Sequence, residues 1–484
     1  MKKTALVVLA LVVISCATNP ATGRRQLILM TEQDEIALGR EADQGVRKEM
    51  GVYPDAAVQQ YVNSVGQRLA KGAVRSNLTW SFTVVDESAV NAFALPGGFI
   101  YVTRGILPYL RNEAELAGVI GHEIGHVDGK HGVDQYSRQM AAGGALAGAS
   151  ILLPKYQPAF GAAGLVAELA FLKHGRTAEL EADHLGVNYA SAGGWAPQAM
   201  VGVLGTLGRL DEAQGSRRGV PNWALSHPPA DDRVAKIQEA VTAAAAKGGT
   251  ATNVPAFERV IDGIVVGDSR EKGMVRGNEF VHPIMRFSLR FPEGWEISNS
   301  SDQVAAVPGE PQGEQRSVAM VLELSKSTQP SLEQAARTEM TAAGLVEVNG
   351  ERARINGLDA YVGTYEKTIQ TTLVRFRVAH VRAGQQTYVI AGMTTADQFA
   401  SVDPSFLTAI RSFRELSQQE ADRIQPSRLT FYEVRSGDTW ASIAARAGTV
   451  TALKPETLAI MNGSDAATPP RPGTRIRLVT AGSR

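Results

Sequence analysis

Residues 121–126 read Gly-His-Glu-Ile-Gly-His and lie within a stretch, residues 112–127, that is predicted to form an amphipathic helix. The apolar residues that recur at helical spacing are Leu116, Val119, Ile120, Ile124 and Val127. Four residues return a helix to within roughly 40° of the same direction, so His122 and His126 can point at one ion. Glu123 is turned about 100° from His122, near enough to hold a water beside that ion. The pattern predicts a catalytic zinc site with Glu123 as the base.

A catalytic zinc site needs a third protein ligand. His131 is one residue out of register with the pattern His-Glu-x-x-His-x-x-Gly-x-x-His, so we exclude that class of site. Residues 179–183, Glu-Leu-Glu-Ala-Asp, offer a better candidate. On a helix Glu179 and Asp183 share one face, while Glu181 points elsewhere. Glu179 can therefore bind zinc, and Asp183 can accept a hydrogen bond from a ligating imidazole. A solvated, acidic helix start is the alternative explanation of the same residues.

Composition excludes several classes of protein. Lys plus Arg and Asp plus Glu number 49 each among 484 residues, so no charge bias points to a nucleic-acid partner. The content of 44% hydrophobic and 20% charged residues is typical of a globular protein, and the length suggests about three domains. The single cysteine, Cys16, excludes an internal disulfide and a cysteine-based zinc site. A metal must therefore be held by His, Asp or Glu.

The amino terminus predicts an export signal. A short basic start precedes an apolar run, residues 5–14, that is too short to span a membrane. Residues 13–16, Val-Ile-Ser-Cys, resemble a bacterial lipobox, which implies cleavage before Cys16 and attachment of lipid to it. Because Ala17 follows the cysteine, the same resemblance favours an outer-membrane lipoprotein in the periplasm. A plain signal peptide with an incidental cysteine is the alternative interpretation of residues 1–16.

Local patterns divide the rest of the chain into three parts, with predicted domains at 31–250, 280–415 and 430–480. Residues 17–30 look like a short tether, and Thr31 with Asp34 resembles a capping box that opens a helix. The elements predicted for the first part are helices at 31–50, 55–70, 112–127 and 178–190 and strands at 80–85 and 99–103. Two apolar segments, 141–153 and 159–172, predict a buried helical hairpin or, alternatively, one that touches membrane or substrate.

From about residue 280 the sequence shows stretches in which apolar and polar residues alternate. The predicted strands of this part are 286–291, 317–324, 360–365, 372–381 and 387–391, with helices at 331–343 and 404–412. These elements predict an α+β domain. A last module, residues 430–480, follows the order strand, helix, helix, strand.

Three stretches of the first domain occur together: residues 91–98, Asn-Ala-Phe-Ala-Leu-Pro-Gly-Gly, residues 122–126 and residues 179–183. The combination resembles the M48 family of zinc metallopeptidases, and in particular its periplasmic, BepA-like branch, over about residues 31–245. The resemblance implies a mainly α, zincin-like domain with a small β-sheet. It implies one zinc ion held by His122, His126 and Glu179, with Glu123 as the base. It also implies a substrate-binding edge strand that contains Asn91, Ala92, Phe93 and Ala94.

The same resemblance draws attention to residues 226–233, Ser-His-Pro-Pro-Ala-Asp-Asp-Arg. In the BepA-like branch the matching histidine can cover the metal and keep the enzyme latent, so His227 is a candidate latch or fourth ligand. A histidine that caps the following helix explains His227 equally well. Arg233, about two turns further on, is a weaker candidate for stabilising an oxyanion. The histidines without a partner pattern, which we expect to be structural, are His174, His184, His282 and His380.

Residues 432–440, Tyr-Glu-Val-Arg-Ser-Gly-Asp-Thr-Trp, and residues 458–463, Leu-Ala-Ile-Met-Asn-Gly, resemble a LysM domain. This resemblance implies a βααβ module that binds glycans containing N-acetylglucosamine, here peptidoglycan, although such a module could also bind protein. We expect Trp440 in its core. Residues 287–295, Phe-Ser-Leu-Arg-Phe-Pro-Glu-Gly-Trp, faintly resemble PsbP/Mog1-like α+β domains and carry no catalytic cluster.

Together these patterns predict a zinc metalloendopeptidase of the cell envelope. Its expected substrates are misfolded or stalled envelope and outer-membrane proteins, while LysM and lipid would anchor it to peptidoglycan and membrane. A chaperone-like or scaffold protein with little proteolysis is the alternative from a different class. An enzyme that acts on the peptides of peptidoglycan is a third.

Overall fold

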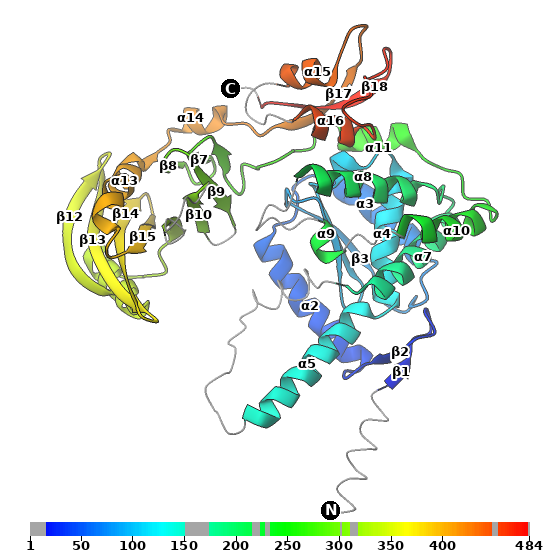
Figure 1. The fold of residues 1–484 in the computed structure, drawn as a ribbon, viewed down its shortest axis with the longest axis horizontal. Helices are drawn as coiled ribbons and strands as arrows, with labels where there is room; N and C mark the ends of the chain where they lie inside the picture. Colours follow the sequence, from blue (N-terminus) through cyan, green and yellow to red (C-terminus); the bar gives the residue numbers. More distant parts are fainter. Residues whose placement is uncertain are drawn as a thin grey trace, which may run out of the picture. The chain divides into compact units, whose positions relative to one another are not determined.

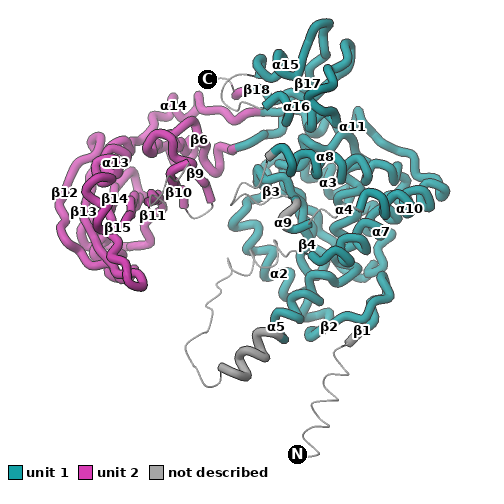
Figure 2. The backbone as a smooth tube through the Cα atoms, viewed as in Figure 1, with its two compact units in different colours: residues 1–267, 428–480 teal, residues 268–427, 481–484 magenta. Residues whose placement is uncertain are grey.

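The computed structural model describes residues 16–150, 174–214, 223–227, 233–300, 303–309, 318–447 and 454–482. The chain forms two compact units, which are coloured separately in Figure 2. Unit 1 comprises the residues up to Gly267 together with Arg428–Thr480, and unit 2 comprises Asp268–Ser427 with the last four residues. Unit 1 is therefore built from two stretches that are distant in sequence.

A small three-stranded sheet lies in unit 1, with strand order β3-β5-β4. Strands β3 (Ser81–Val85) and β5 (Phe99–Thr103) are parallel, and β4 (Ala92–Leu95) is antiparallel to β5. Helices make up most of the rest of the unit (Figure 1). They are α2 (Glu32–Glu49), α3 (Ala56–Ala70), η1 (Leu107–Tyr109), α4 (Glu113–Asp128), α5 (His131–Ser150), α7 (Arg176–Ala192), α8 (Ala199–Gln214), α9 (Trp223–Ser226), α10 (Arg233–Ala245) and α11 (Val254–Ile261).

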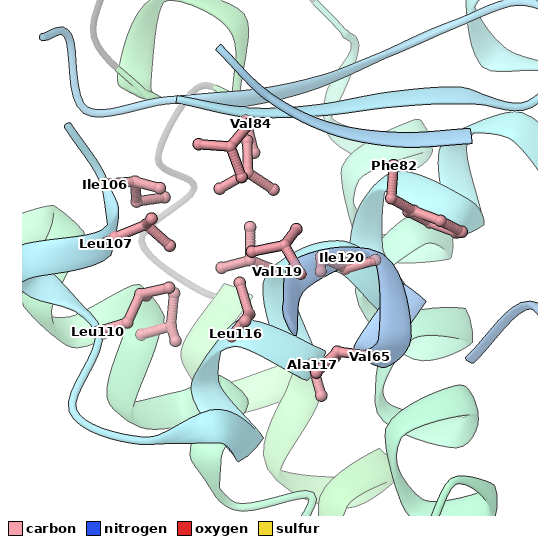
Figure 3. Packing of buried hydrophobic residues seen from close by; sticks show 14 of the residues in the cluster. Val65, Phe82, Val84, Ile106, Leu107, Leu110, Leu116, Ala117, Val119 and Ile120 are labelled. Atoms are coloured by element: carbon pink, nitrogen blue, oxygen red, sulfur yellow. The ribbon is translucent and has the colours of Figure 1, made fainter. Parts of the chain in front are cut away.

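Helix α4 runs through the core of unit 1, and all of its residues are buried. It begins after Asn112, whose side chain accepts a hydrogen bond from the backbone nitrogen of Glu115. Figure 3 shows Leu116, Val119 and Ile120 of this helix among apolar side chains from other elements. The labelled partners in that view are Val65, Phe82, Val84, Ile106, Leu107 and Leu110. The predicted helix is thus confirmed, with ends within one residue of those expected, but it is buried on all sides rather than on its apolar face alone.

The residues that we expected to form a tether, 17–30, instead contain a small antiparallel hairpin of β1 (Cys16–Thr18) and β2 (Arg25–Leu27). Asn19 Oδ1 accepts hydrogen bonds from the backbone nitrogens of Ala21 and Thr22 at 2.8 and 3.0 Å, which closes the turn. The hairpin is fastened to α5, because the backbone nitrogen of Leu27 donates to Asp134 at 2.8 Å. The tether prediction failed because the partners of this segment lie more than a hundred residues away.

The last stretch of unit 1 has the expected order of β17 (Arg428–Glu433), α15 (Trp440–Arg446), α16 (Pro455–Met461) and β18 (Arg475–Thr480). Thr439 caps α15, and Trp440 is buried and donates from its indole to the carbonyl of Thr468 at 2.7 Å. This stretch shares the hydrophobic core around α4. The side chains that it contributes to that core are Leu429, Ile460, Met461 and Val479.

Unit 2 is rich in β-structure. A seven-stranded antiparallel sheet has the order β12-β13-β14-β15-β11-β10-β9, and a four-stranded sheet has the order β16-β8-β7-β6. The strands are β6 (Met274–Arg276), β7 (Glu279–His282), β8 (Phe287–Arg290), β9 (Trp295–Asn299), β10 (Gln303–Pro308), β11 (Ala319–Leu324), β12 (Val346–Ile355), β13 (Leu358–Ile369), β14 (Thr372–Ala383), β15 (Gln386–Thr395) and β16 (Arg414–Glu415). The helices are α12 (Leu332–Ala342), α13 (Phe399–Ser412) and α14 (Gln418–Arg423).

The apolar segments expected at 141–153 and 159–172 are only partly described. Helix α5 covers the first of them as far as Ser150, and the remainder lies outside the described residues, as do residues 1–15 of the predicted export signal. Within the described part of the chain, none of the helices is both long enough and apolar enough to cross a membrane.

Candidate metal centre

Helices α4 and α7 carry most of the candidate site and lie in close contact. A Cβ atom on Gly186 would come within 2.7 Å of the backbone nitrogen of His122, and one on Gly125 within 2.9 Å of Ala182 Cα. Such backbone proximity requires residues without bulky side chains, since interiors leave no spare volume. The close approach brings Glu179, in the first turn of α7, next to both histidines of α4.

Four buried side chains, His122, His126, Glu179 and His227, converge on one point, and we call them the donor cluster. His122 Nε2 lies 3.0 Å from His126 Nε2, 3.3 Å from His227 Nδ1 and 3.6 Å from Glu179 Oε2. Glu179 Oε1 lies 3.5 Å from His126 Nε2 and 3.2 Å from His227 Nδ1. The structure thus brings together three predicted ligands and the candidate latch.

The geometry of the donor cluster is consistent with one tetrahedral metal ion. Four-coordinate zinc holds nitrogen and oxygen donors at about 2.1 Å, which places neighbouring donor atoms about 3.4 Å apart. The separations of 3.0–3.6 Å within the cluster lie around this value. Three imidazoles and one carboxylate are also donor types that zinc takes in proteins. The residues present therefore fit the ion that the sequence predicts.

Glu123 lies beside the donor cluster. Its Oε1 atom is 3.5 Å from His227 Nε2, and its side chain is buried. Burial raises the pKa of Glu123, and the charges of His227 and His122 partly oppose this shift. A carboxylate with a raised pKa beside a metal site is well suited to accept and return a proton.

Asp183 and Arg233 contact two of the predicted ligands, His122 and Glu179. Asp183 Oδ1 lies 2.9 Å from His122 Nδ1, and Arg233 donates to both Asp183 oxygens at 2.8 and 2.9 Å. Arg233 Nη1 also lies 2.9 Å from Glu179 Oε2. Burial alone would raise the pKa of Glu179, but the charges of His227, His122 and Arg233 lower it to about 2. Glu179 therefore stays ionised, and the expected role of Arg233 at an oxyanion stays a prediction.

The predicted substrate strand borders the site. Asn91 precedes β4, which contains Ala92, Phe93 and Ala94, and its side chain accepts a hydrogen bond from Ser226 Oγ at 3.4 Å. Among the described residues, β4 pairs with β5 and with no second strand. A hollow lies between the end of β4 and the donor cluster. Its lining includes Ala94, Leu95, Pro96, His126, Val133 and His174.

Sequence spacing did not reveal several side chains that contact the donor cluster. His174 stacks on His126 with ring centroids 4.0 Å apart, and Trp223 stacks on His227 at 4.1 Å. His131 Nδ1 lies 2.9 Å from His126 Nδ1. These residues come from separate turns and helices, so no periodic signal connects them with the motif. His184 is exposed on α7, whereas His282 and His380 lie in unit 2.

Comparison with known proteins agrees with this geometry. Residues 56–241 match the model of peptidase family M48. The beta-barrel assembly-enhancing protease of Escherichia coli (strain K12) is 34% identical over 216 residues, which are 41% of this chain and 43% of that protein. Metalloprotease YcaL of the same strain is 31% identical over 188 residues, which are 36% of this chain and 70% of that protein.

A similar solved structure is the Saccharomyces cerevisiae Ran-binding protein Mog1p, with 14% identity and a TM-score of 0.24. The match covers 30% of this chain and 98% of Mog1p. The sequence match to the beta-barrel assembly-enhancing protease, by contrast, covers less than half of that relative.

The fold of unit 1 and the donor cluster define the class of the protein as a metallopeptidase. The chain belongs to peptidase family M48.

Proposed function

We propose that this protein is a zinc metalloendopeptidase that cleaves misfolded or stalled proteins of the bacterial cell envelope. The observation that carries the proposal is the buried donor cluster with Glu123 beside it. Zinc held by His122, His126 and Glu179 would lower the pKa of a water and polarise the scissile carbonyl. Glu123 would take the proton of the attacking water and return it to the leaving amine.

In this proposal His227 keeps the resting enzyme latent. Four protein donors close a tetrahedral site, whereas a catalytic site leaves one position open. His227 Nδ1 lies 3.3 and 3.2 Å from the donor atoms of His122 and Glu179, which supports it as the fourth ligand. His227 must then leave before water and substrate can enter. Because the ligands come from α4 and α7, the proposed departure of His227 leaves three of them in place.

The proposed substrate is an extended segment of an unfolded protein. Strand β4, with Ala92, Phe93 and Ala94, is paired on one side only among the described residues, so its other edge can bind an extended chain. The hollow beside β4 and His126 supports the same placement. The name of the Escherichia coli relative, a beta-barrel assembly-enhancing protease, favours β-barrel proteins as the class of substrate.

A cleavage assay tests the peptidase proposal. The chain from residue 16 onward, carrying Cys16→Ser, is incubated with an unfolded outer-membrane β-barrel protein, with zinc and after chelation. We expect zinc-dependent cleavage that falls by about 10²-fold or more in Glu123→Gln, because the proton acceptor is lost. His227→Ala should cleave faster, because it opens the fourth position. Glu212→Gln, an exposed change on α8, is the matched control and should behave as the parent chain.

The opposite outcome has a defined meaning. If every variant binds zinc and the unfolded protein but none cleaves it, the peptidase proposal fails for this substrate class. The chaperone-like or scaffold alternative then takes its place. If cleavage occurs and His227→Ala does not increase it, the peptidase stands and the latch is rejected.

We further propose that residues 430–480 form a LysM domain that binds peptidoglycan and that Cys16 carries a lipid anchor in the outer membrane. The two-stranded sheet of β17 and β18 with helices α15 and α16 supports the first part. The protein should sediment with purified sacculi and be released by oligomers of N-acetylglucosamine. Full-length protein should incorporate labelled fatty acid in cells, whereas Cys16→Ala should not. A negative result in either experiment rejects the corresponding anchor and does not affect the peptidase proposal.

A further inference from the structure

The ring of His126 has partners on both sides. Its Nε2 atom faces the donor cluster, 3.0 Å from His122 Nε2, and its Nδ1 atom lies 2.9 Å from His131 Nδ1. On the far side of His131, Nε2 lies 3.0 Å from Glu181 Oε2. The His131 side chain is 2% exposed, so these contacts are formed away from solvent.

The direction of each hydrogen bond follows from Glu181, the last residue in the series His126, His131 and Glu181. An ionised carboxylate only accepts hydrogen bonds, so His131 Nε2 donates to Glu181. The Nδ1 atom of a neutral His131 is then an acceptor, and His126 Nδ1 must donate to it. This fixes the tautomer of His126 and leaves the lone pair of its Nε2 directed at the donor cluster.

We propose that His131 and Glu181 are positioning residues that hold the ligand His126 in the tautomer and orientation that bind a metal ion. The inference rests on the proposed metal site and deepens it. The other α4 ligand, His122, obtains the same support directly, because Asp183 Oδ1 lies 2.9 Å from its Nδ1. Metal-ligating histidines regularly need such a partner on the second ring nitrogen. His122 therefore contacts the carboxylate of Asp183 directly. His126 contacts the carboxylate of Glu181 through the imidazole of His131.

The turn between α4 and α5 places His131 under His126. Lys130, the residue just before His131, has φ of 51°, in the left-handed region, and ends the turn. A Cβ atom on Gly129 would lie 2.4 Å from His131 Nε2, so the ring fits only against a glycine. The amino-terminal hairpin holds this turn, because Gln26 donates to the carbonyl of Gly129 at 2.5 Å.

The amino-terminal hairpin also contacts Glu181, the last residue in this series. Arg24 Nη1 lies 3.3 Å from Glu181 Oε2, the oxygen that accepts from His131. The guanidinium holds the carboxylate turned toward the imidazole. Because the Arg24 side chain is 41% exposed, we expect it to contribute less than the buried members.

Zinc affinity measured by competition with a chromophoric chelator tests the proposal without requiring catalysis. In His131→Asn the amide oxygen can replace Nδ1 as the acceptor, so affinity should remain within about threefold of the parent chain. In His131→Leu the acceptor is lost, and affinity should fall about 10–100-fold. If His131 only fills space, His131→Leu should lower zinc affinity less than His131→Asn, because leucine suits a buried site better than asparagine. His184→Leu, an exposed change on α7, is the matched control.

Two further variants keep the test valid if His131→Leu fails to fold. Gly129→Ala leaves every functional group in place but displaces the His131 ring, and it should reproduce most of the loss of zinc affinity. Glu181→Met removes the terminal acceptor from a partly exposed position and should give a smaller loss of about three- to tenfold. Unchanged affinity in Gly129→Ala and Glu181→Met, or a weaker effect of His131→Leu than of His131→Asn, would overturn the proposal.

The failures of the two proposals can be told apart. A parent chain that binds zinc but cleaves no unfolded protein rejects the peptidase function and leaves the affinity comparison intact. A parent chain that cleaves in a zinc-dependent way, with no affinity difference among the His131 variants, rejects only the positioning role.

Discussion

Buried charges in this protein are held by partners from other elements. Glu35 is 1% exposed on α2, and its oxygens lie 2.6 Å from Arg75 Nη1 and 3.2 Å from Lys130 Nζ. Asp128, at the end of α4, accepts hydrogen bonds from the backbone nitrogens of Val74 and Arg75 at 2.8 and 3.0 Å. Leaving one member of such a pair buried alone costs several kcal/mol, so these contacts fix the end of the helix that carries the metal site.

Buried His282 gives unit 2 a predictable response to acid. Its Nδ1 atom accepts a hydrogen bond from the backbone nitrogen of Met285 at 3.3 Å, and burial lowers the pKa of His282 from the usual 6.5 to about 4. Between these two values the unfolded chain binds a proton that the folded chain does not. The free energy of unfolding of unit 2 should therefore fall as the pH drops from about 6.5 to 4, by up to about 3 kcal/mol.

Urea unfolding followed by hydrogen exchange of peptides from unit 2 measures this loss. His282→Asn keeps an acceptor for Met285 without a titrating ring, so its stability should change less over the same pH range. His184→Asn, exposed on α7, should retain the full pH dependence. An unchanged pH dependence in His282→Asn would assign the acid response to other groups.

At the scale of elements, the contact between α4 and α7 sets the distance between the predicted ligands. Alanine is favoured over glycine in a helix by about 1 kcal/mol, so Gly186→Ala would stabilise an isolated α7. In the protein its Cβ would meet the backbone of His122 at 2.7 Å. We expect a net destabilisation of about 1–3 kcal/mol and weaker zinc binding, because Glu179 moves with α7.

The matched control for Gly186→Ala is Gly208→Ala on α8, where a Cβ would meet no atom within 4 Å. That change should raise the stability of unit 1 by up to about 1 kcal/mol, as measured by thermal and urea unfolding. If Gly186→Ala and Gly208→Ala stabilise unit 1 equally, α7 can move away from α4 without a loss of stability.

Elements with local signals were predicted well from the sequence. Thr31 caps α2 as the capping box predicted, and the helices expected at 55–70 and 112–127 are α3 and α4, which Asp55 and Asn112 cap. Strand β12 was missed although its partner β13 is the next strand in sequence: it lies at a sheet edge and is mostly exposed, so it lacks a regular apolar alternation. The spacing of His122 and His126 is also local, whereas the contact between His131 and His126 depends on one left-handed residue, Lys130, that sequence patterns do not reveal.

At the scale of the whole molecule, residues 268–427 of unit 2 are an insertion into the sequence of unit 1. The chain leaves unit 1 after Gly267 and returns at Arg428, and Val265 and Arg428 are antiparallel bridge partners. The two crossing points are therefore neighbours within unit 1. A chain that lacks residues 268–427, with Gly267 joined to Arg428 through Asn-Gly, needs only a short hairpin loop at this place.

We expect this shortened chain to fold, to unfold cooperatively and to bind zinc with the affinity of the full chain. Thermal unfolding and chelator competition measure both properties. The control is a chain that ends at Ser427, which removes Leu429, Ile460, Met461 and Val479 from the core around α4 and should destabilise unit 1 strongly. Aggregation of the shortened chain together with a stable truncated chain would contradict this description of unit 1.

The discontinuity of unit 1 also bears on the order of biosynthesis. A polypeptide grows from its amino terminus, so α4 and α7, with their histidines and Glu179, are made long before β17, α16 and β18. The core around α4 lacks Met461 and Val479 until α16 and β18 have also been made. The unit that carries the metal centre can therefore complete its core only after the whole of Asp268–Ser427 has been made.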